Sequence, residues 1–361
     1  GRPCHTDAHC PPPSRCLVDP FVPYQSWLEV RAAYGPVALG VFRALYLEAA
    51  PPEANVALLR LAFALAFLSL VALVLAVRGA VAGAVLAWLP LGAEISANGG
   101  HLEPLIGLAL VGLLWARRGR WQALVIGVCA GLLAALKIHL GVLALPALAL
   151  IWRDRGLLQA ALAAVIAGVI VAGGYGLLWV SPHPFGGLVD VGDTSIRTPL
   201  DLWRRGLQAV GGDGDLSGVR VGFLAVWAVI VGGVLWRQHR RASGEAPFPS
   251  APATLQIWLA TTALASGIYH PWYALPGLVI WLLSCTAGRP IVTVGARSVA
   301  WLAVASSLIV NGVWLGVGPA SFTSPWVLLP TLLLWVPALG LWLHDLRRTA
   351  ATAPHNGAIH R

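Results

Sequence analysis

The chain contains a single lysine, Lys137, among its 24 lysine and arginine residues, and this lysine closes an apolar stretch. A basic side chain at a membrane edge can simply extend its charge to the headgroup layer while its stem stays in lipid. However, the chain uses arginine at its other basic positions, and an ammonium group is a compact anchor for phosphate. We therefore favour binding of a lipid phosphate at Lys137 over a purely interfacial role.

A second polar segment covers residues 98–104, with the sequence Asn-Gly-Gly-His-Leu-Glu-Pro. It places His101 and Glu103 next to the start of another apolar stretch. These side chains could cap the helix that begins there. They could equally bind the hydroxyl groups of a sugar, or hold a cation. The residue types leave both roles open.

A third segment, residues 269–273, combines three aromatic residues with a histidine and a proline. Aromatic rings gather at membrane interfaces whatever the function of the protein, and Pro271 can serve only to end a helix. The same rings can stack on a sugar, and His270 can transfer protons near neutral pH. His270, Trp272 and Tyr273 are therefore candidate sugar-binding or acceptor-binding residues.

Near the N-terminus, Cys4, Cys10 and Cys16 lie in a polar segment that also contains two histidines. Cysteine and histidine are zinc ligands, although their spacing here matches no standard zinc finger. In an oxidising compartment, two of the three cysteines could instead form a disulfide. Both possibilities stay open from the sequence.

The composition places most of the chain in a lipid bilayer. Hydrophobic residues make up 58% of the sequence and charged residues only 11%. A water-soluble domain of this size could not cover so much apolar surface. The net charge of +9 does not indicate nucleic-acid binding, because the arginines occupy short gaps and no groove-reading motif is present. The sequence also lacks a phosphate-cradling glycine loop, which argues against nucleotide-driven chemistry.

We predict an all-α, polytopic integral membrane protein, because the apolar stretches show no alternation with a period of two. About eleven transmembrane helices are expected if neighbouring helices shelter the shorter ones. They cover residues 55–77, 80–93, 104–116, 121–136, 140–152, 157–180, 218–236, 254–269, 272–286, 298–317 and 325–343.

Arginine-bearing gaps alternate with arginine-poor gaps between these stretches, and basic loops stay on the cytoplasmic side of a membrane. This rule places the tail, residues 344–361, in the cytoplasm and residues 1–54 outside the cell. The N-terminal loop includes a candidate interfacial amphipathic helix over 36–48, and a first membrane helix is expected upstream of Gly1. A second long outer loop covers residues 181–217. Lys137 and the other two polar segments fall on the outer side.

Taken in order, several short motifs resemble the GT-C glycosyltransferases of actinobacteria that use polyprenyl-phosphate mannose. The nearest likeness is to the alpha-mannosyltransferases that extend lipid-linked mannans, including alpha-1,6-mannosyltransferases. Residues 100–103 are similar to the family's Gly-His-Asn-Asp element, with Leu102 and Glu103 as departures. The other matching motifs are Asp19-Pro20-Phe21, Tyr34-Gly35-Pro36, Ala135-Leu136-Lys137 and Pro271-Trp272-Tyr273.

This resemblance implies a GT-C fold and a catalytic carboxylate in the first outer loop. Asp19 and Asp7 are the candidates in this chain, unless the family's base lies upstream of Gly1. Lys137, with Arg31, would stabilise the departing lipid phosphate, and no metal or other cofactor would be required. The residues expected to line the sugar and acceptor site are Tyr34, His101, Glu103, His270, Trp272 and Tyr273.

The hypothesis from the sequence is therefore a glycosyltransferase of the plasma membrane with its active face outside the cell. It would transfer a hexose, mannose by preference, from a polyprenyl phosphate to a glycolipid or polysaccharide acceptor. A transporter or lipid flippase is one alternative, although the ionisable residues gather at one mouth and no internal repeat is visible. A non-catalytic assembly protein whose outer loops bind a partner is the other.

Overall fold

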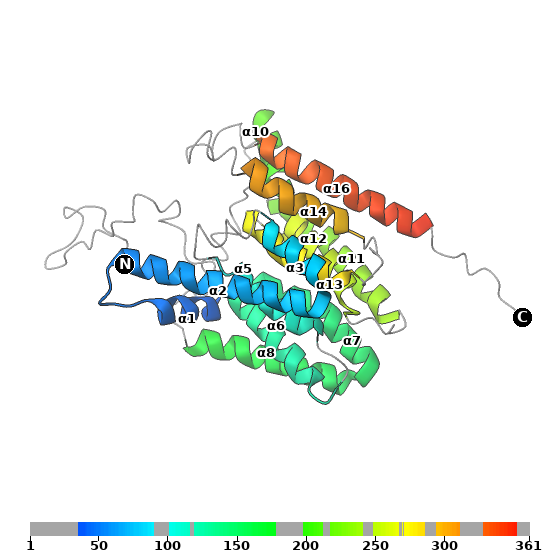
Figure 1. Cartoon of the computed structure of the whole chain (residues 1–361). Coiled ribbons are helices and arrows are strands. Elements are labelled where there is room, and N and C mark those ends of the chain that lie inside the picture. Colours follow the sequence, from blue (N-terminus) through cyan, green and yellow to red (C-terminus); the bar gives the residue numbers. More distant parts are fainter. Residues whose placement is uncertain are drawn as a thin grey trace, which may run out of the picture.

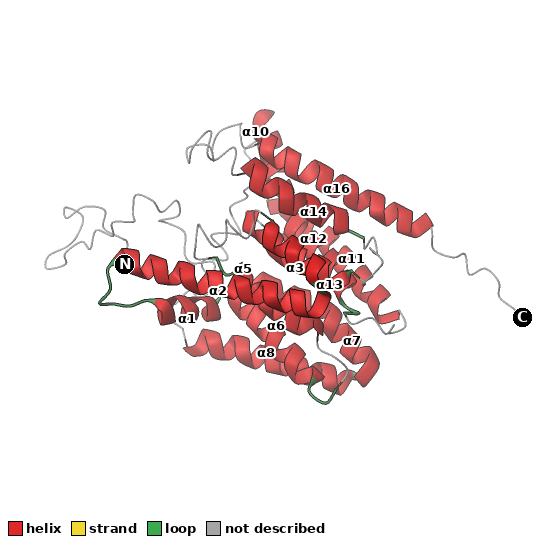
Figure 2. Cartoon of the chain, viewed as in Figure 1, coloured by secondary structure: helices red, strands yellow, loops and turns green. Residues whose placement is uncertain are grey.

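The computed structural model describes residues 35–89, 101–115, 119–177, 198–211, 217–240, 248–266, 269, 271–285, 294–310 and 328–351. These residues form helices joined by turns and short loops, and no strand occurs among them (Figures 1 and 2). This confirms the predicted all-α class.

The helices follow one another as α1 (Pro36–Leu45), α2 (Pro52–Arg78), α3 (Ala80–Trp88), α5 (Glu103–Trp115), α6 (Gln122–Leu136), η3 (Ile138–Ala144), α7 (Leu145–Arg155), α8 (Leu157–Leu177), α10 (Pro199–Ala209), α11 (Ser217–Arg240), α12 (Ala251–Ala260), η4 (Thr261–Ala265), η5 (Pro271–Tyr273), α13 (Ala274–Ser284), α14 (Ala296–Ala305), η6 (Ser306–Val310) and α16 (Leu328–Ala351). Of the short segments, η3 and η5 are 3₁₀-helical, whereas η4 and η6 are π-helical.

Four helices, α2, α8, α11 and α16, are long and apolar enough to cross a membrane. Their outward faces carry exposed apolar side chains such as Leu158, Val169 and Val229. Apolar surface of this extent is stable only against lipid or another apolar partner. The chain therefore has the character of a membrane protein.

Each of the eleven predicted stretches contains helix, but most of these helices are shorter than a bilayer crossing. For example, α5 has 13 residues, which corresponds to about 20 Å of length against about 30 Å of hydrocarbon. The shorter apolar helices α5, α6 and α13 are largely buried between their neighbours. The number of eleven crossings stays a prediction.

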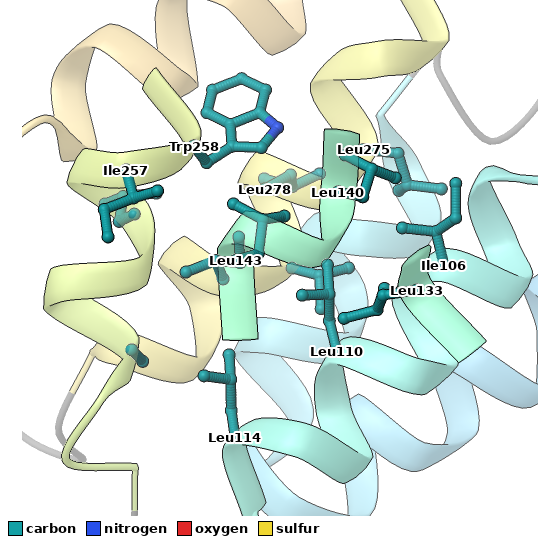
Figure 3. Packing of buried hydrophobic residues seen from close by; sticks show 14 of the residues in the cluster. Ile106, Leu110, Leu114, Leu133, Leu140, Leu143, Ile257, Trp258, Leu275 and Leu278 are labelled. Atoms are coloured by element: carbon teal, nitrogen blue, oxygen red, sulfur yellow. The ribbon is translucent and has the colours of Figure 1, made fainter. Parts of the chain in front are cut away.

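The centre of the bundle is formed by α5, α6, α12 and α13, which pack leucine and isoleucine side chains around η3 (Figure 3). Apolar residues on all sides of a helix are typical of a buried helix, and α13 is buried from Ala274 through Ile280. Gly277 allows this helix to approach α12 closely, because a Cβ atom there would lie 2.6 Å from Cζ3 of Trp258. The core thus fixes the ends of α5, α6 and α13 relative to one another.

At one end of the bundle, several arginine-bearing helix termini meet. Arg153 Nη1 donates to the carbonyl of Gln238 at 3.2 Å, and Gln238 Nε2 donates to the carbonyl of Pro249 at 3.2 Å. Arg78 Nε donates to the carbonyl of Leu282 at 3.1 Å. We call this the arginine end. In Figure 1, α2 and α16 run in the same direction, so the basic C-terminal part of α16 points the same way as Arg78.

The opposite end, which we call the lysine end, contains Glu103 at the start of α5, Lys137 after the end of α6 and Tyr273 before α13. It also contains three ion pairs: Arg43 contacts Glu48, and two arginines of α10 contact one buried aspartate. The predicted alternation of the gaps is therefore realised as two opposite ends of the bundle. Which end faces the cytoplasm stays a prediction of the charge rule.

Two segments differ from the sequence-based expectations. Residues 344–351, which we expected to begin a tail, continue α16, because Asp345 is buried there, pairs with Arg297 and accepts from the backbone N–H of Gly295 at 3.2 Å. Within the predicted outer loop 181–217, residues 199–209 form α10, an amphipathic helix capped by Thr198. The predicted segment 36–48 contains helix α1, which ends at Leu45. Its position at a membrane interface stays a prediction.

Candidate functional site

The site is built around Lys137, which follows the last residue of α6. Its backbone is extended (φ −148°, ψ 113°), so the α-helix ends here and the chain turns into η3. The Lys137 N–H still donates to the carbonyl of Leu133 at 3.0 Å. Only 5% of the residue is exposed. A buried ammonium needs a partner of opposite charge, so this lysine does not simply extend into the headgroup layer.

The partner is Glu103, the first residue of α5, whose Oε1 atom lies 2.5 Å from Lys137 Nζ. Both side chains are almost completely buried. Besides the ammonium, the start of α5 favours the carboxylate, because a helix N-terminus carries partial positive charge. Thirty-four positions separate the two residues in the sequence. The fold thus joins two of the three predicted polar segments in one ion pair.

The third segment supplies an aromatic wall. Lys137 Nζ lies 4.1 Å from the centre of the Tyr273 ring, which is a cation–π contact. Trp272 meets Tyr273 edge-on, and His101 stacks on Trp272 with 3.9 Å between ring centres. Tyr269 is fully buried and also contacts Tyr273 edge-on. Tyr273 therefore contacts the ammonium in addition to Glu103, and Trp272, Tyr269 and His101 extend the aromatic wall around it.

The stacked His101 lies in the loop before α5. Burial lowers the pKa of His101 below its ordinary value of 6.5, the charge of Glu103 opposes this shift, and the charge of Lys137 adds to it. The imidazole is therefore neutral at pH 7, which leaves the Glu103–Lys137 pair as the charged contact of the site. A neutral ring is suited to stacking and hydrogen bonding rather than to binding an anion by charge.

A small cavity opens beside the ion pair. Its volume is about 20 Å³, which accommodates a water molecule or one oxygen of a ligand but not a whole sugar ring. A ligand larger than this must bind at the mouth or widen the cavity. The polar residues that line it are Glu103, Lys137, His139, Thr261, Thr262 and Ser266, with Tyr273 beside them.

The threonine and serine residues that line the cavity were not predicted. Thr261 and Thr262 belong to the π-helical turn η4, and Ser266 follows it. Trp227 Nε1 of α11 donates to Thr261 Oγ1 at 3.0 Å, which fixes that side chain. Isolated π turns inside helices often occur at functional sites. In the sequence, residues 254–269 form one apolar stretch, and the three small polar residues near its end are the only local sign of this turn.

Gly35 attaches α1 to this end of the bundle. Its N–H donates to the carbonyl of Leu136 at 2.9 Å, one residue before Lys137. A Cβ atom on Gly35 would overlap the carbonyl oxygen of Ala135. The backbone conformation of Gly35 does not require glycine, because its φ of −74° is open to other residues. Glycine is required because a side chain would not fit between the two backbones.

We expect Gly35→Ala to lower the free energy of unfolding by about 1–3 kcal/mol, because the added methyl group must displace backbone. Thermal unfolding of the detergent-solubilised protein measures this. The matched control is Gly168→Ala in α8, where an added Cβ meets nothing within 4 Å. Because alanine favours a helix more than glycine does, the melting temperature of this variant should stay the same or rise slightly. Equal melting temperatures for the two variants would contradict the docking of α1 on α6.

Of the predicted site residues, the structure brings together His101, Glu103, Lys137, Trp272 and Tyr273. The predicted catalytic and donor-binding residues Asp7, Asp19, Arg31 and Tyr34, together with His270 and the three N-terminal cysteines, lie outside the described residues. Within the described ranges, no group of three or more His, Cys, Asp and Glu side chains could hold a metal ion.

Comparisons of the chain with models of protein families, with curated proteins and with solved structures find no match.

Proposed function

We propose that the protein is a membrane glycosyltransferase that transfers a hexose, mannose by preference, from a polyprenyl phosphate to a glycolipid or polysaccharide acceptor. The observation that supports this most is the buried Lys137 ammonium, which lies against Glu103 and an aromatic wall at one end of a lipid-exposed helical bundle. The proposal includes a GT-C-like arrangement with about eleven crossings of the plasma membrane and a cytoplasmic C-terminus.

The chemistry of the transfer accounts for these residue types. The acceptor oxygen forms a bond to the anomeric carbon, and the bond from that carbon to the phosphate oxygen breaks. The electron pair leaves on the phosphate, where an ammonium group stabilises the developing charge. A carboxylate takes the proton of the acceptor hydroxyl. Lys137 supplies the cation, and Asp7 and Asp19 remain proposed carboxylates.

The surroundings suit such substrates. A polyprenyl chain needs an apolar path, and α8 and α11 present apolar side chains outwards. A sugar needs a flat ring to stack on, and Trp272 is partly exposed beside Tyr273. The lysine end lies opposite the arginine end, so the charge rule would place the site outside the cell.

One observation favours transport instead. An ion pair buried within an apolar helical bundle is expensive and commonly marks a substrate or proton pathway. Glu103 and Lys137 form such a pair, and the helices nearby are interrupted by the π turn η4. A transporter or lipid flippase is therefore the second candidate, and it would move its substrate without breaking a bond.

Purified protein in liposomes should transfer labelled mannose from polyprenyl-phosphate mannose to a mannosylated lipid acceptor, because the donor supplies both the sugar and the phosphate leaving group. Thin-layer separation of the lipid products measures the transfer. A nucleotide-linked mannose in place of the lipid donor should give no product. Movement of intact polyprenyl-phosphate mannose across the vesicle membrane, with no labelled acceptor formed, would instead support the transporter.

A further inference from the structure

We infer that Glu103 holds Lys137 in the empty site, releases it to the lipid phosphate of the donor, and then accepts the proton of the acceptor hydroxyl. This inference rests on the proposed function, which names the donor and the acceptor. It assigns the proton-accepting step to Glu103 in place of Asp7 and Asp19, and it adds an order of events.

In the empty site, Lys137 and Glu103 form a close ion pair. The contact of 2.5 Å between Nζ and Oε1 joins one positive and one negative group, both nearly inaccessible to solvent. The pair is therefore close to electrically neutral when the site is empty. Such a pair protects the lysine from the cost of burying an uncompensated charge. Glu103 thus occupies the contact that a bound phosphate would make.

A bound donor phosphate changes the net charge of the site. A polyprenyl-phosphate sugar carries one negative charge on its diester, so two anions would then share one ammonium. Like charges in a buried site make a carboxylate a better proton acceptor. The acceptor hydroxyl supplies the proton that restores the balance. Glu103 would therefore become a good proton acceptor only when the donor is bound.

The ammonium of Lys137 can also reach a bound phosphate. The lysine side chain has a flexible four-carbon stem, and its ammonium also contacts the Tyr273 ring. The cation can turn away from Glu103 towards the cavity while Tyr273 continues to hold it. Thr262 and Ser266 line the same cavity and offer hydroxyl groups to the phosphate oxygens. The cavity already has room for one such oxygen.

The transfer then balances within the site. The proton of the acceptor hydroxyl moves to the Glu103 carboxylate as the acceptor oxygen bonds to the anomeric carbon. The bond between that carbon and the phosphate oxygen breaks, and its electron pair stays on the phosphate beside Lys137. When polyprenyl phosphate leaves, Glu103 returns its proton to water and pairs with Lys137 again.

The test is Glu103→Gln, which keeps the shape of the side chain and removes its charge. Two measurements should move in opposite directions. The affinity for farnesyl phosphate, measured against farnesol, should rise about tenfold, because Lys137 no longer has to leave a carboxylate. The rate of mannose transfer should fall by about 100-fold or more, because the proton acceptor is lost. The control Glu48→Gln removes an exposed carboxylate from the turn after α1 and should change neither value.

Weaker binding of farnesyl phosphate by Glu103→Gln, or transfer at the original rate, would overturn the inference. A third result is that the unmodified protein transfers no mannose while Glu103→Gln still binds farnesyl phosphate more tightly. This result would overturn the proposed function and the proton-accepting role of Glu103, but it would support the transfer of Lys137 from Glu103 to the lipid phosphate. Should Glu103→Gln not fold, Glu103→Asp provides the second test. Aspartate keeps the negative charge, but its side chain is shorter by one methylene group, so the rate of mannose transfer should fall about tenfold. An unchanged rate would show that Glu103 is not the proton acceptor.

Discussion

Replacing Glu103 by leucine should lower the free energy of unfolding by about 3–5 kcal/mol, because it leaves the buried Lys137 ammonium without its carboxylate. The double variant Glu103→Leu with Lys137→Met should recover most of this loss, since two apolar side chains of similar size then replace the pair. Unfolding of the detergent-solubilised protein by denaturant measures both variants. The size of the recovery reports the coupling between the two residues.

The exposed pair Arg43–Glu48 provides the matched control, because its side chains are 69% and 72% accessible. Exposed ion pairs contribute little to stability, so Glu48→Leu should have only a small effect. If Glu103→Leu is equally mild, or if the double variant is less stable than either single variant, the buried ion pair is not present in the protein.

Replacing Lys137 by methionine should reduce the rate of sugar transfer by about 100- to 1,000-fold, because the phosphate then leaves without a cation to stabilise its charge. Methionine keeps the apolar stem and removes the ammonium, so the change isolates the charge. The measurement is the initial rate at saturating polyprenyl-phosphate mannose, referred to the amount of protein that elutes as a folded species.

Two controls sharpen this experiment. Lys137→Arg keeps a positive charge but replaces a compact ammonium by a planar fork, so it should retain part of the activity. Arg43→Gln removes a cation of α1 that lies outside the pocket and pairs with Glu48, and it should leave the rate unchanged. Transfer by Lys137→Met at the rate of the unmodified protein would show that this lysine does not bind the leaving group.

Much of the architecture followed from the sequence because apolar periodicity and charge are local properties. The polar segments around Glu103, Lys137 and Tyr273 were expected on the same side of the membrane, because they occupy every second gap between the apolar stretches. In the structure these segments meet at the lysine end of the bundle, and the side of the membrane on which this end lies stays a prediction. Helix positions were also predicted closely, with α2, α8 and α11 beginning or ending within a few residues of the expected limits.

The direct contact between Glu103 and Lys137 could not be predicted, because it depends on how far α5 and α6 slide along each other. Core packing determines that register, including the close approach allowed by small residues such as Gly107, which faces Leu70 of α2. From the sequence, Glu103 could cap a helix, bind sugar hydroxyl groups or hold a cation. The structure shows that the cation it contacts is the ammonium of Lys137, a partner that the sequence did not identify.

The π turn η4 and helix α10 were missed for a different reason. A π turn differs from an α-helix by one inserted residue, which apolar composition does not reveal, so Thr261 and Thr262 were read as part of a span. Helix α10 is short and lies in a loop rich in glycine and proline. Within the helix, the buried Asp201 pairs with Arg204 and Arg205. The helix also packs against α16 and η4, which are distant in the sequence.

The most direct measurement is an experimental structure of the protein with bound polyprenyl phosphate. We expect a phosphate oxygen about 2.8 Å from Lys137 Nζ, with the ammonium turned away from Glu103 and still over the Tyr273 ring. A phosphate bound elsewhere, with the ion pair between Lys137 and Glu103 intact, would show that Lys137 does not bind the leaving group.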